Sequence, residues 1–140
     1  MPAYPVLMHT AIDATACRSL AEFYRQFLGL RYRRGDEIPA GGSDDDPDWL
    51  VLLDPNGHRV FAFQKVPALA RPTWPAHDVP KQMHHDFRVP SVEELQRQLR
   101  RAEELGATLL YDRTDDDTEP LYVLADPAGH PFCLLVGSEQ

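Results

Sequence analysis

The sequence DPNGH at residues 54–58 returns as DPAGH at residues 126–130, 72 positions later (126 − 54). Each copy lies between two short apolar runs, WLVLL and VFAF around the first, LYVLA and FCLLV around the second. Proline fixes φ and glycine accepts a positive φ, so each motif predicts a tight turn between two antiparallel strands. The chain therefore contains two predicted β-hairpins with the same turn chemistry.

Each hairpin is preceded by a pattern typical of an amphipathic helix that ends at glycine. Apolar residues recur at helical spacing through 20–28, which Gly29 follows, and through 92–105, which Gly106 follows. The sequence SVEE at 91–94 has the form of a capping box at the start of the second helix. Both glycines suit the left-handed position just after a helix.

Strand-like segments flank each helix. We expect them before the helices at 6–12 and 82–89, and after the helices at 30–34 and 108–113. Each half of the chain then reads strand, helix, strand, strand, strand. The sequence therefore predicts an α+β fold made of two tandem βαβββ modules.

The length of 140 residues fits one domain of ordinary size. Within this single domain, 1–140, the repeat defines a first module at 5–66 and a second module at 81–137. The segment between them, 67–80, is rich in proline and is interpreted as a connection.

The charge and composition of the chain exclude several classes of partner. Lys plus Arg number 14 and Asp plus Glu number 22, a net charge of −8, so we expect no nucleic-acid partner and no membrane surface. The apolar runs are far shorter than the ~20 residues of a membrane helix. Two cysteines cannot make a disulfide framework, and residues 1–5 have no signal-peptide pattern, so a cytoplasmic location is expected. The acidic clusters at 44–46 and 115–117 are interpreted as solvated loop tips.

Strand alternation assigns side chains to two faces, one toward the helices and one away from them. The residues expected to face the helices are Phe61 and Phe63, then Met83, His85, Phe87 and Val89, and finally Phe132, Leu134 and Val136. The residues expected on the opposite face are Val60, Ala62, Gln64 and Val66, then Gln82, His84, Asp86 and Arg88, and finally Pro131, Cys133 and Leu135.

This duplicated pattern resembles the vicinal oxygen chelate superfamily, which includes glyoxalase I, extradiol dioxygenases and bleomycin-resistance proteins. The motifs that carry the resemblance are MHT at 8–10, FY at 23–24 with LG at 28–29, the two DPxGH turns, WP at 74–75, QMHHD at 82–86 and HPFCL at 130–134. The last three look most like the glyoxalase-like subgroup. The resemblance implies that the two modules form an open, cup-shaped sheet and that the protein is a homodimer.

The resemblance also locates four candidate metal ligands. Metal enzymes of this family carry one ligand on the first and last strand of each module, and here those places correspond to His9, His84, Gln64 and Cys133. Cys133 occupies the position of a glutamate in the family, and Gln64 lies two residues beyond Ala62, which occupies the other such position. Because both carboxylates are lost, we expect no metal cofactor. A divalent metal (Zn²⁺, Fe²⁺ or Ni²⁺) on these four residues is the alternative, and thiolate with imidazole would suit Zn²⁺.

The expected function is therefore that of a glyoxalase-like protein that binds a small organic molecule in its cup without a metal. Trp49, Gln64, His84 and Cys133 would line the cup and Trp74 would close over it, although plain packing is an equal alternative for both tryptophans. Two enzymatic alternatives stay open. One is a metal-dependent lyase, isomerase or dioxygenase with His9 and His84 as ligands. The other is a metal-independent enzyme with His84 and Asp86 as acid and base.

Overall fold

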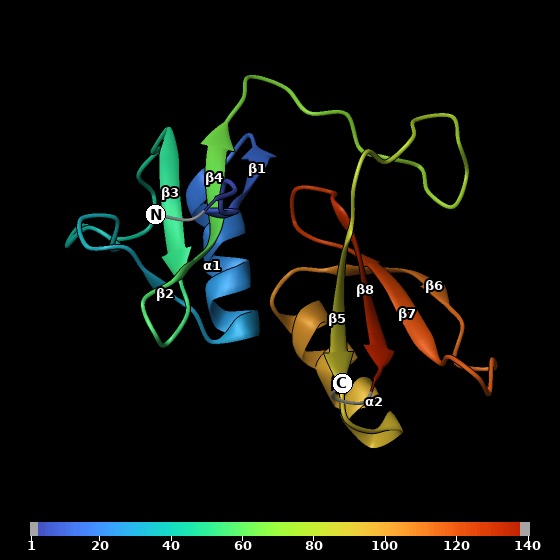
Figure 1. Ribbon diagram of the computed structural model, residues 1–140. Coiled ribbons are helices and arrows are strands. Elements are labelled where there is room, and N and C mark those ends of the chain that lie inside the picture. The colour runs from blue at the N-terminus through green and yellow to red at the C-terminus, as the bar shows by residue number, and fades with distance from the viewer. Residues whose placement is uncertain (1–2, 138–140) are drawn as a thin grey trace. The chain divides into compact units, whose positions relative to one another are not determined.

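The structure, a computed structural model, describes residues 3–137 and divides into two compact units, Met1–Leu69 and Ala70–Gln140 (Figure 1). The first unit contains β1 (Thr10–Ala14), α1 (Cys17–Leu28), β2 (Arg31–Tyr32), β3 (Trp49–Leu53) and β4 (Arg59–Lys65). The second contains β5 (His85–Val89), α2 (Val92–Glu104), β6 (Thr108–Asp112), β7 (Leu121–Ala125) and β8 (Pro131–Val136). The predicted α+β fold of two βαβββ modules is thus confirmed.

The two sheets have the same topology. Their strand orders are β1-β4-β3-β2 and β5-β8-β7-β6, and in each the first strand pairs in parallel with the last. The predicted hairpin turns join β3 to β4 and β7 to β8. In the first, Asp54 N donates to His58 O at 2.8 Å, and the corresponding bond from Asp126 N to His130 O is 2.9 Å. Gly57 and Gly129 have φ values of 84° and 99°, as the turn chemistry requires.

The first strand of each unit begins three residues later than predicted, or more. The segments expected at 6–12 and 82–89 become β1 from Thr10 and β5 from His85. Pairing begins at Phe61 of β4 and at Phe132 of β8, close to the hairpin turns that precede these strands, so the residues farther upstream in 6–12 and 82–89 have no strand beside them. Met83, expected to face the helix, is 67% exposed for this reason.

The helices pack on one face of each sheet, as predicted from the apolar stripes (Figure 1). Tyr24 of α1 contacts both Phe61 and Phe63 of β4, with ring centroids 5.1 and 6.1 Å apart. In the second unit Phe87 of β5 contacts Phe132 of β8 at 5.7 Å. Burial of these aromatic rings contributes to the apolar core of each unit.

The helix ends follow the predicted chemistry. Gly29 follows α1 with a φ of 69° and donates its N–H to Arg25 O. At the start of α2, Ser91 Oγ accepts the N–H of Glu94 at 3.2 Å. The carboxylate of Glu94 binds the Arg97 guanidinium, so only one half of the expected capping box is present.

The acidic cluster at 44–46 is only partly a solvated loop tip: Asp44 and Asp46 are exposed, whereas Asp45 is half-buried and is bound by a buried arginine of α1. Arg18 is 4% exposed, and its Nε and Nη2 donate to the two carboxylate oxygens of Asp45 at 3.0 and 2.8 Å. Arg18 Nη1 also donates to Asp36 O at 2.7 Å, and Asp46 pairs with Lys65. These contacts fasten the long segment between β2 and β3 to α1 and β4.

The chain enters the second unit through a fastened segment. The side chain of Arg71 crosses the second hairpin turn and donates from Nη2 to Pro127 O at 3.1 Å. A Cβ atom on Gly129 would lie 2.8 Å from Arg71 Cγ, so any larger residue would displace the arginine side chain. Thr73 N donates to Val79 O at 2.8 Å, and this bond closes a short loop that carries Trp74.

Candidate functional site

The strand registers align equivalent positions in the two units. In the first sheet Ala62 of β4 lies between Ala11 and Val51, and in the second sheet Cys133 of β8 lies between Asp86 and Val123. The two rows occupy the same place in the same topology. The row in the first unit carries only aliphatic side chains, whereas the row in the second unit carries a carboxylate and a thiol.

A pocket of about 560 Å³ lies over the carboxylate–thiol row of the second unit. Its floor is the apolar cluster of Leu121, Val123 and Cys133, against which Trp74 and Leu135 pack. The full set of lining residues is Trp74, Pro75, His84, Asp86, Tyr111, Arg113, Glu119, Leu121, Val123, Cys133 and Leu135. All of them belong to the second unit, so the pocket needs no residue of the first.

The polar wall of this pocket is a histidine–aspartate pair beneath a tryptophan. His84 Nε2 lies 3.3 Å from Asp86 Oδ1. The Trp74 ring stacks on the His84 ring, with centroids 5.4 Å apart and planes inclined by 26°. The ammonium of Lys81 lies 4.2 Å from the centroid of the Trp74 ring, a cation–π contact that helps to hold the indole in place. The structure therefore brings together four of the sequence candidates: Trp74, His84, Asp86 and Cys133.

Cys133 is protonated at neutral pH in this environment. Burial, followed by the nearby Asp86 carboxylate, raises the pKa of the Cys133 thiol to about 12. Since the thiolate is the nucleophilic form, the residue acts as a small apolar surface of the floor unless a metal replaces its proton.

The family implies a divalent metal, and the donor atoms of the second unit are a fit for zinc. One ligand atom each from His84, Asp86 and Cys133 lies within 4.8 Å of the other two. Nitrogen, oxygen and sulfur donors in a three-residue set leave a fourth position open, which is the usual arrangement of catalytic zinc. A thiol is a poor ligand for harder ions such as Mn²⁺. Asp86 was not among the ligands predicted from the sequence.

The remaining sequence candidates lie in the first unit. The rings of His9 and Trp49 are 5.8 Å apart and inclined by 59°. Within the described part of the chain, the buried Nδ1 of His9 has no hydrogen-bond partner. Burial, and then the charges of Arg59 and Arg33, lower the pKa of His9. Gln64 is exposed and pairs with Trp49 in the register of β3 and β4. The four predicted metal ligands are therefore divided, two in each unit.

Sequence reasoning missed the third side of the pocket. Tyr111, Arg113 and Glu119 line it from β6 and the segment after it. Alternation along the predicted strand 108–113 would have placed Tyr111 and Arg113 on one face. A register shift in the β6–β7 pairing, between Leu109 and Tyr111, weakens that signal.

The chain belongs to the Glyoxalase-like domain family, whose sequence profile matches residues 9–135. None of the curated proteins compared with the chain matches it. In the described residues no helix has the length and apolar character needed to cross a membrane.

Several solved structures share the fold at low sequence identity. The fosfomycin resistance protein FosX from Listeria monocytogenes is 15% identical, with 96% of this chain and 95% of that chain covered and a TM-score of 0.66. A glyoxalase/bleomycin resistance protein/dioxygenase family enzyme from Burkholderia phytofirmans is 17% identical, with coverage of 92% and 96% and a TM-score of 0.64. A glyoxalase/dioxygenase from Nostoc punctiforme is 19% identical, with coverage of 99% and 100% and a TM-score of 0.61. At these identities the likeness establishes the fold alone.

Proposed function

We propose that this glyoxalase-like protein binds a small organic molecule in the pocket of its second unit. The observation that carries the proposal is an apolar floor bordered by a few polar side chains, with His84 and Asp86 paired on one side and Tyr111, Arg113 and Glu119 on another. Pockets of this size and character bury most of a small ligand, while a few polar groups fix its orientation. Trp74 and Cys133 supply apolar surface, and His84 supplies the directional hydrogen bond.

The lining favours a compact ligand with one apolar ring or chain and one hydroxyl or carbonyl group. The apolar part would cover Leu121 and Val123, and the polar group would meet His84. The contribution of Trp49 and Gln64 remains a prediction from the sequence, as do the cytoplasmic location and the homodimer. Sedimentation analysis of the purified chain tests the homodimer directly.

The chain offers a specific reporter for this proposal because it has only two tryptophans, one in each unit. Trp49→Phe leaves Trp74 as the single indole, so its fluorescence reports on the pocket. A library of small aromatic, hydroxyl and carbonyl compounds is titrated against this variant, and hits are checked by thermal shift, since ligands of the folded state raise its apparent stability.

His84→Ala should weaken a hit about tenfold or more, because a buried polar contact is lost. His77→Ala is the matched control, since His77 is exposed and lies outside the pocket lining. A library with no hit on Trp74, or hits that bind His84→Ala and the parent equally, would contradict the proposal.

The same pair supports an acid–base role without a metal. Asp86 orients the imidazole of His84, and a histidine held in this way can serve as a general acid or base. If a library compound is converted, Asp86→Asn should lower the turnover rate more than the affinity. Turnover that is unchanged by Asp86→Asn and by His84→Ala would remove this role.

The three clustered donors favour a second candidate function, a zinc-dependent reaction. A FosX from Listeria monocytogenes has been solved with Mn(II) and sulfate, so the fold accommodates a metal in that protein. Zinc at His84, Asp86 and Cys133 would supply Lewis acidity at the open position. Elemental analysis after zinc loading should give one equivalent for the parent, and a loss in Cys133→Ala but not in Cys17→Ala. No zinc uptake by the parent would leave metal-free binding as the function.

A further inference from the structure

A row of four side chains crosses the whole second sheet beneath the pocket under Trp74. The strand register pairs Asp86 of β5 with Cys133 of β8. It continues from Cys133 to Val123 of β7, and from Val123 to Tyr111 of β6. Side chains paired in this way lie on the same face of a sheet, and all four line the pocket. The row therefore has a polar side chain at each end and an apolar floor between them.

A neighbouring row repeats this arrangement along the side of the pocket. Leu135 of β8 pairs with Leu121 of β7, and Arg113 N donates to Leu121 O at 2.9 Å, which continues the pairing past the end of β6. Because Arg113 follows Tyr111 by two residues, it points to the same face. The strand order β5-β8-β7-β6 places three interstrand spacings, roughly 14 Å, between the two polar ends.

The β6 side of the pocket can donate hydrogen bonds but has no excess of positive charge. Arg113 donates to Asp116 through Nη2 at 3.2 Å, and its guanidinium carries further N–H groups for a ligand. Asp116 balances the charge of Arg113, and Glu119 lines the same side of the pocket. This side therefore favours a neutral acceptor, such as a hydroxyl or carbonyl oxygen, over an anion.

The β5 side also combines charges of both signs. The carboxylate of Asp86 lies 3.3 Å from His84 Nε2, and the ammonium of Lys81 lies 4.2 Å from the centroid of the Trp74 ring. A charged group on a ligand would meet a like charge here, whichever its sign. The β5 side therefore also favours a neutral polar group, which His84 and Asp86 can hydrogen-bond.

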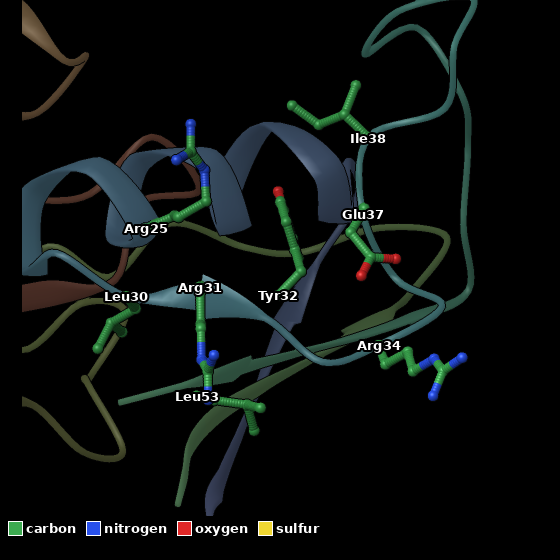
Figure 2. Close-up of a pocket in the computed structure, with 8 residues that line it drawn as sticks. All are labelled: Arg25, Leu30, Arg31, Tyr32, Arg34, Glu37, Ile38 and Leu53. Atoms are coloured by element: carbon green, nitrogen blue, oxygen red, sulfur yellow. The ribbon is translucent and has the colours of Figure 1, made fainter. Parts of the chain in front are cut away.

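The pocket of the first unit has a different arrangement (Figure 2). It has a volume of about 620 Å³, lies at the edge strand β2, and has Arg25, Arg31 and Arg34 among its lining residues. Figure 2 shows the side chains of Arg31 and Arg34 pointing in different directions, so one small ligand would not bridge them. The facing pair of polar ends is a property of the pocket in the second unit.

We infer that the ligand of the pocket under Trp74 is a two-ended molecule, with a flat apolar body and a neutral hydroxyl or carbonyl group at each end. This inference rests on the proposed function and adds a second anchor to it. One polar group meets His84 and Asp86. The other accepts a hydrogen bond from Tyr111 or Arg113, and the body covers the apolar floor between them.

The test compares 4,4′-biphenol, which has a hydroxyl group at each end, with 4-phenylphenol, which has one. Affinities are measured by calorimetric titration of the whole chain. Quenching of Trp74 in the Trp49→Phe background verifies that each compound binds in the second unit.

The variant Tyr111→Phe/Arg113→Gln removes the second anchor without removing either side chain from the floor of the pocket. Tyr4→Phe/Arg100→Gln is the matched control, since both residues are exposed and lie outside the pocket lining. Circular dichroism verifies that each variant is folded.

We expect the parent to bind 4,4′-biphenol about three- to tenfold more tightly than 4-phenylphenol, since one more hydrogen bond forms. The Tyr111/Arg113 variant should bind the two compounds equally, and it should bind 4-phenylphenol as tightly as the parent does. The control variant should keep the ratio of the parent. A third compound, 4′-hydroxybiphenyl-4-carboxylate, should bind more weakly than 4,4′-biphenol, because its charged end meets a carboxylate on either side of the pocket.

The second anchor is overturned if the parent binds the two phenols equally or if the Tyr111/Arg113 variant keeps the ratio of the parent. Tighter binding of the carboxylate than of 4,4′-biphenol overturns the neutral class of ligand. In these cases the proposed function stands, because the compounds still bind. If neither phenol binds while other library compounds do, the inference alone fails. If no compound reaches Trp74, the proposed function fails with it.

Discussion

Replacing Gly129 by alanine tests whether the Arg71 side chain fastens the Trp74 segment to the second unit. At a φ of 99°, an alanine side chain is strained by about 1–2 kcal/mol. The new Cβ would also lie 2.8 Å from Arg71 Cγ, so the arginine must move and lose its hydrogen bond to Pro127 O. That bond is worth about 0.5–1.5 kcal/mol. The total expected loss is therefore about 1.5–3.5 kcal/mol of unfolding free energy.

The repeat supplies the matched control. Gly57 occupies the same place in the first hairpin, with a φ of 84°, and a Cβ there meets only Arg31 Nη2 at 3.5 Å, an ordinary contact. Gly57→Ala should therefore cost only the backbone strain of about 1–2 kcal/mol. Urea unfolding is followed by Trp74 fluorescence in a Trp49→Phe background for the second unit, and by Trp49 fluorescence in a Trp74→Phe background for the first.

A double-mutant cycle isolates the contact itself. In an Arg71→Ala background the cost of Gly129→Ala should fall by about 1 kcal/mol, because the clash and the hydrogen bond are both absent. If Gly129→Ala costs the same with and without Arg71, the side chain does not fasten the segment, and the reasoning is refuted.

Three further outcomes follow from contacts elsewhere. Arg18→Ala removes the hydrogen bonds of a buried guanidinium and should lower the unfolding free energy by about 2–3 kcal/mol. Because Arg18 holds the pKa of Asp45 below its usual range, the parent should lose this stability as pH falls through the acid range. In urea titrations at stepped pH, Arg18→Ala should therefore lose stability less steeply with acid than the parent. Burial raises the pKa of Cys133 from about 9 to about 12, so stability should decline as pH rises across that window, and Cys133→Ala should flatten the decline in thermal melts at stepped pH. Ser91→Ala removes the cap of α2 and should cost about 1 kcal/mol, measured by urea unfolding, and an unchanged midpoint would contradict the capping role.

The parts of the fold that could be predicted are those with local causes. The turns at Gly57 and Gly129 follow from proline and glycine chemistry, and the stripe of α1 follows from helical spacing. The starts of β1 at Thr10 and of β5 at His85 differ from the prediction because they depend on where pairing with β4 and β8 begins. That information is distant in the sequence.

The same distinction applies to the side chains around the pockets. Alternation alone assigned His84 and Asp86 to one face, and the structure places them 3.3 Å apart. The Arg18–Asp45 pair joins residues 27 positions apart through a segment without periodicity, so no local pattern indicated it.

The matched cross-strand positions of the two sheets allow one unit of the chain to serve as the control for the other. The two βαβββ units present one topology twice, and they differ at matched positions: the second unit has Asp86 and Cys133 where the first has Ala11 and Ala62. This correspondence can be used in an experiment. The double substitution Ala11→Asp with Ala62→Cys would place the same two side chains at the matched positions of the first unit. The variant would show how much of the chemistry the scaffold itself confers.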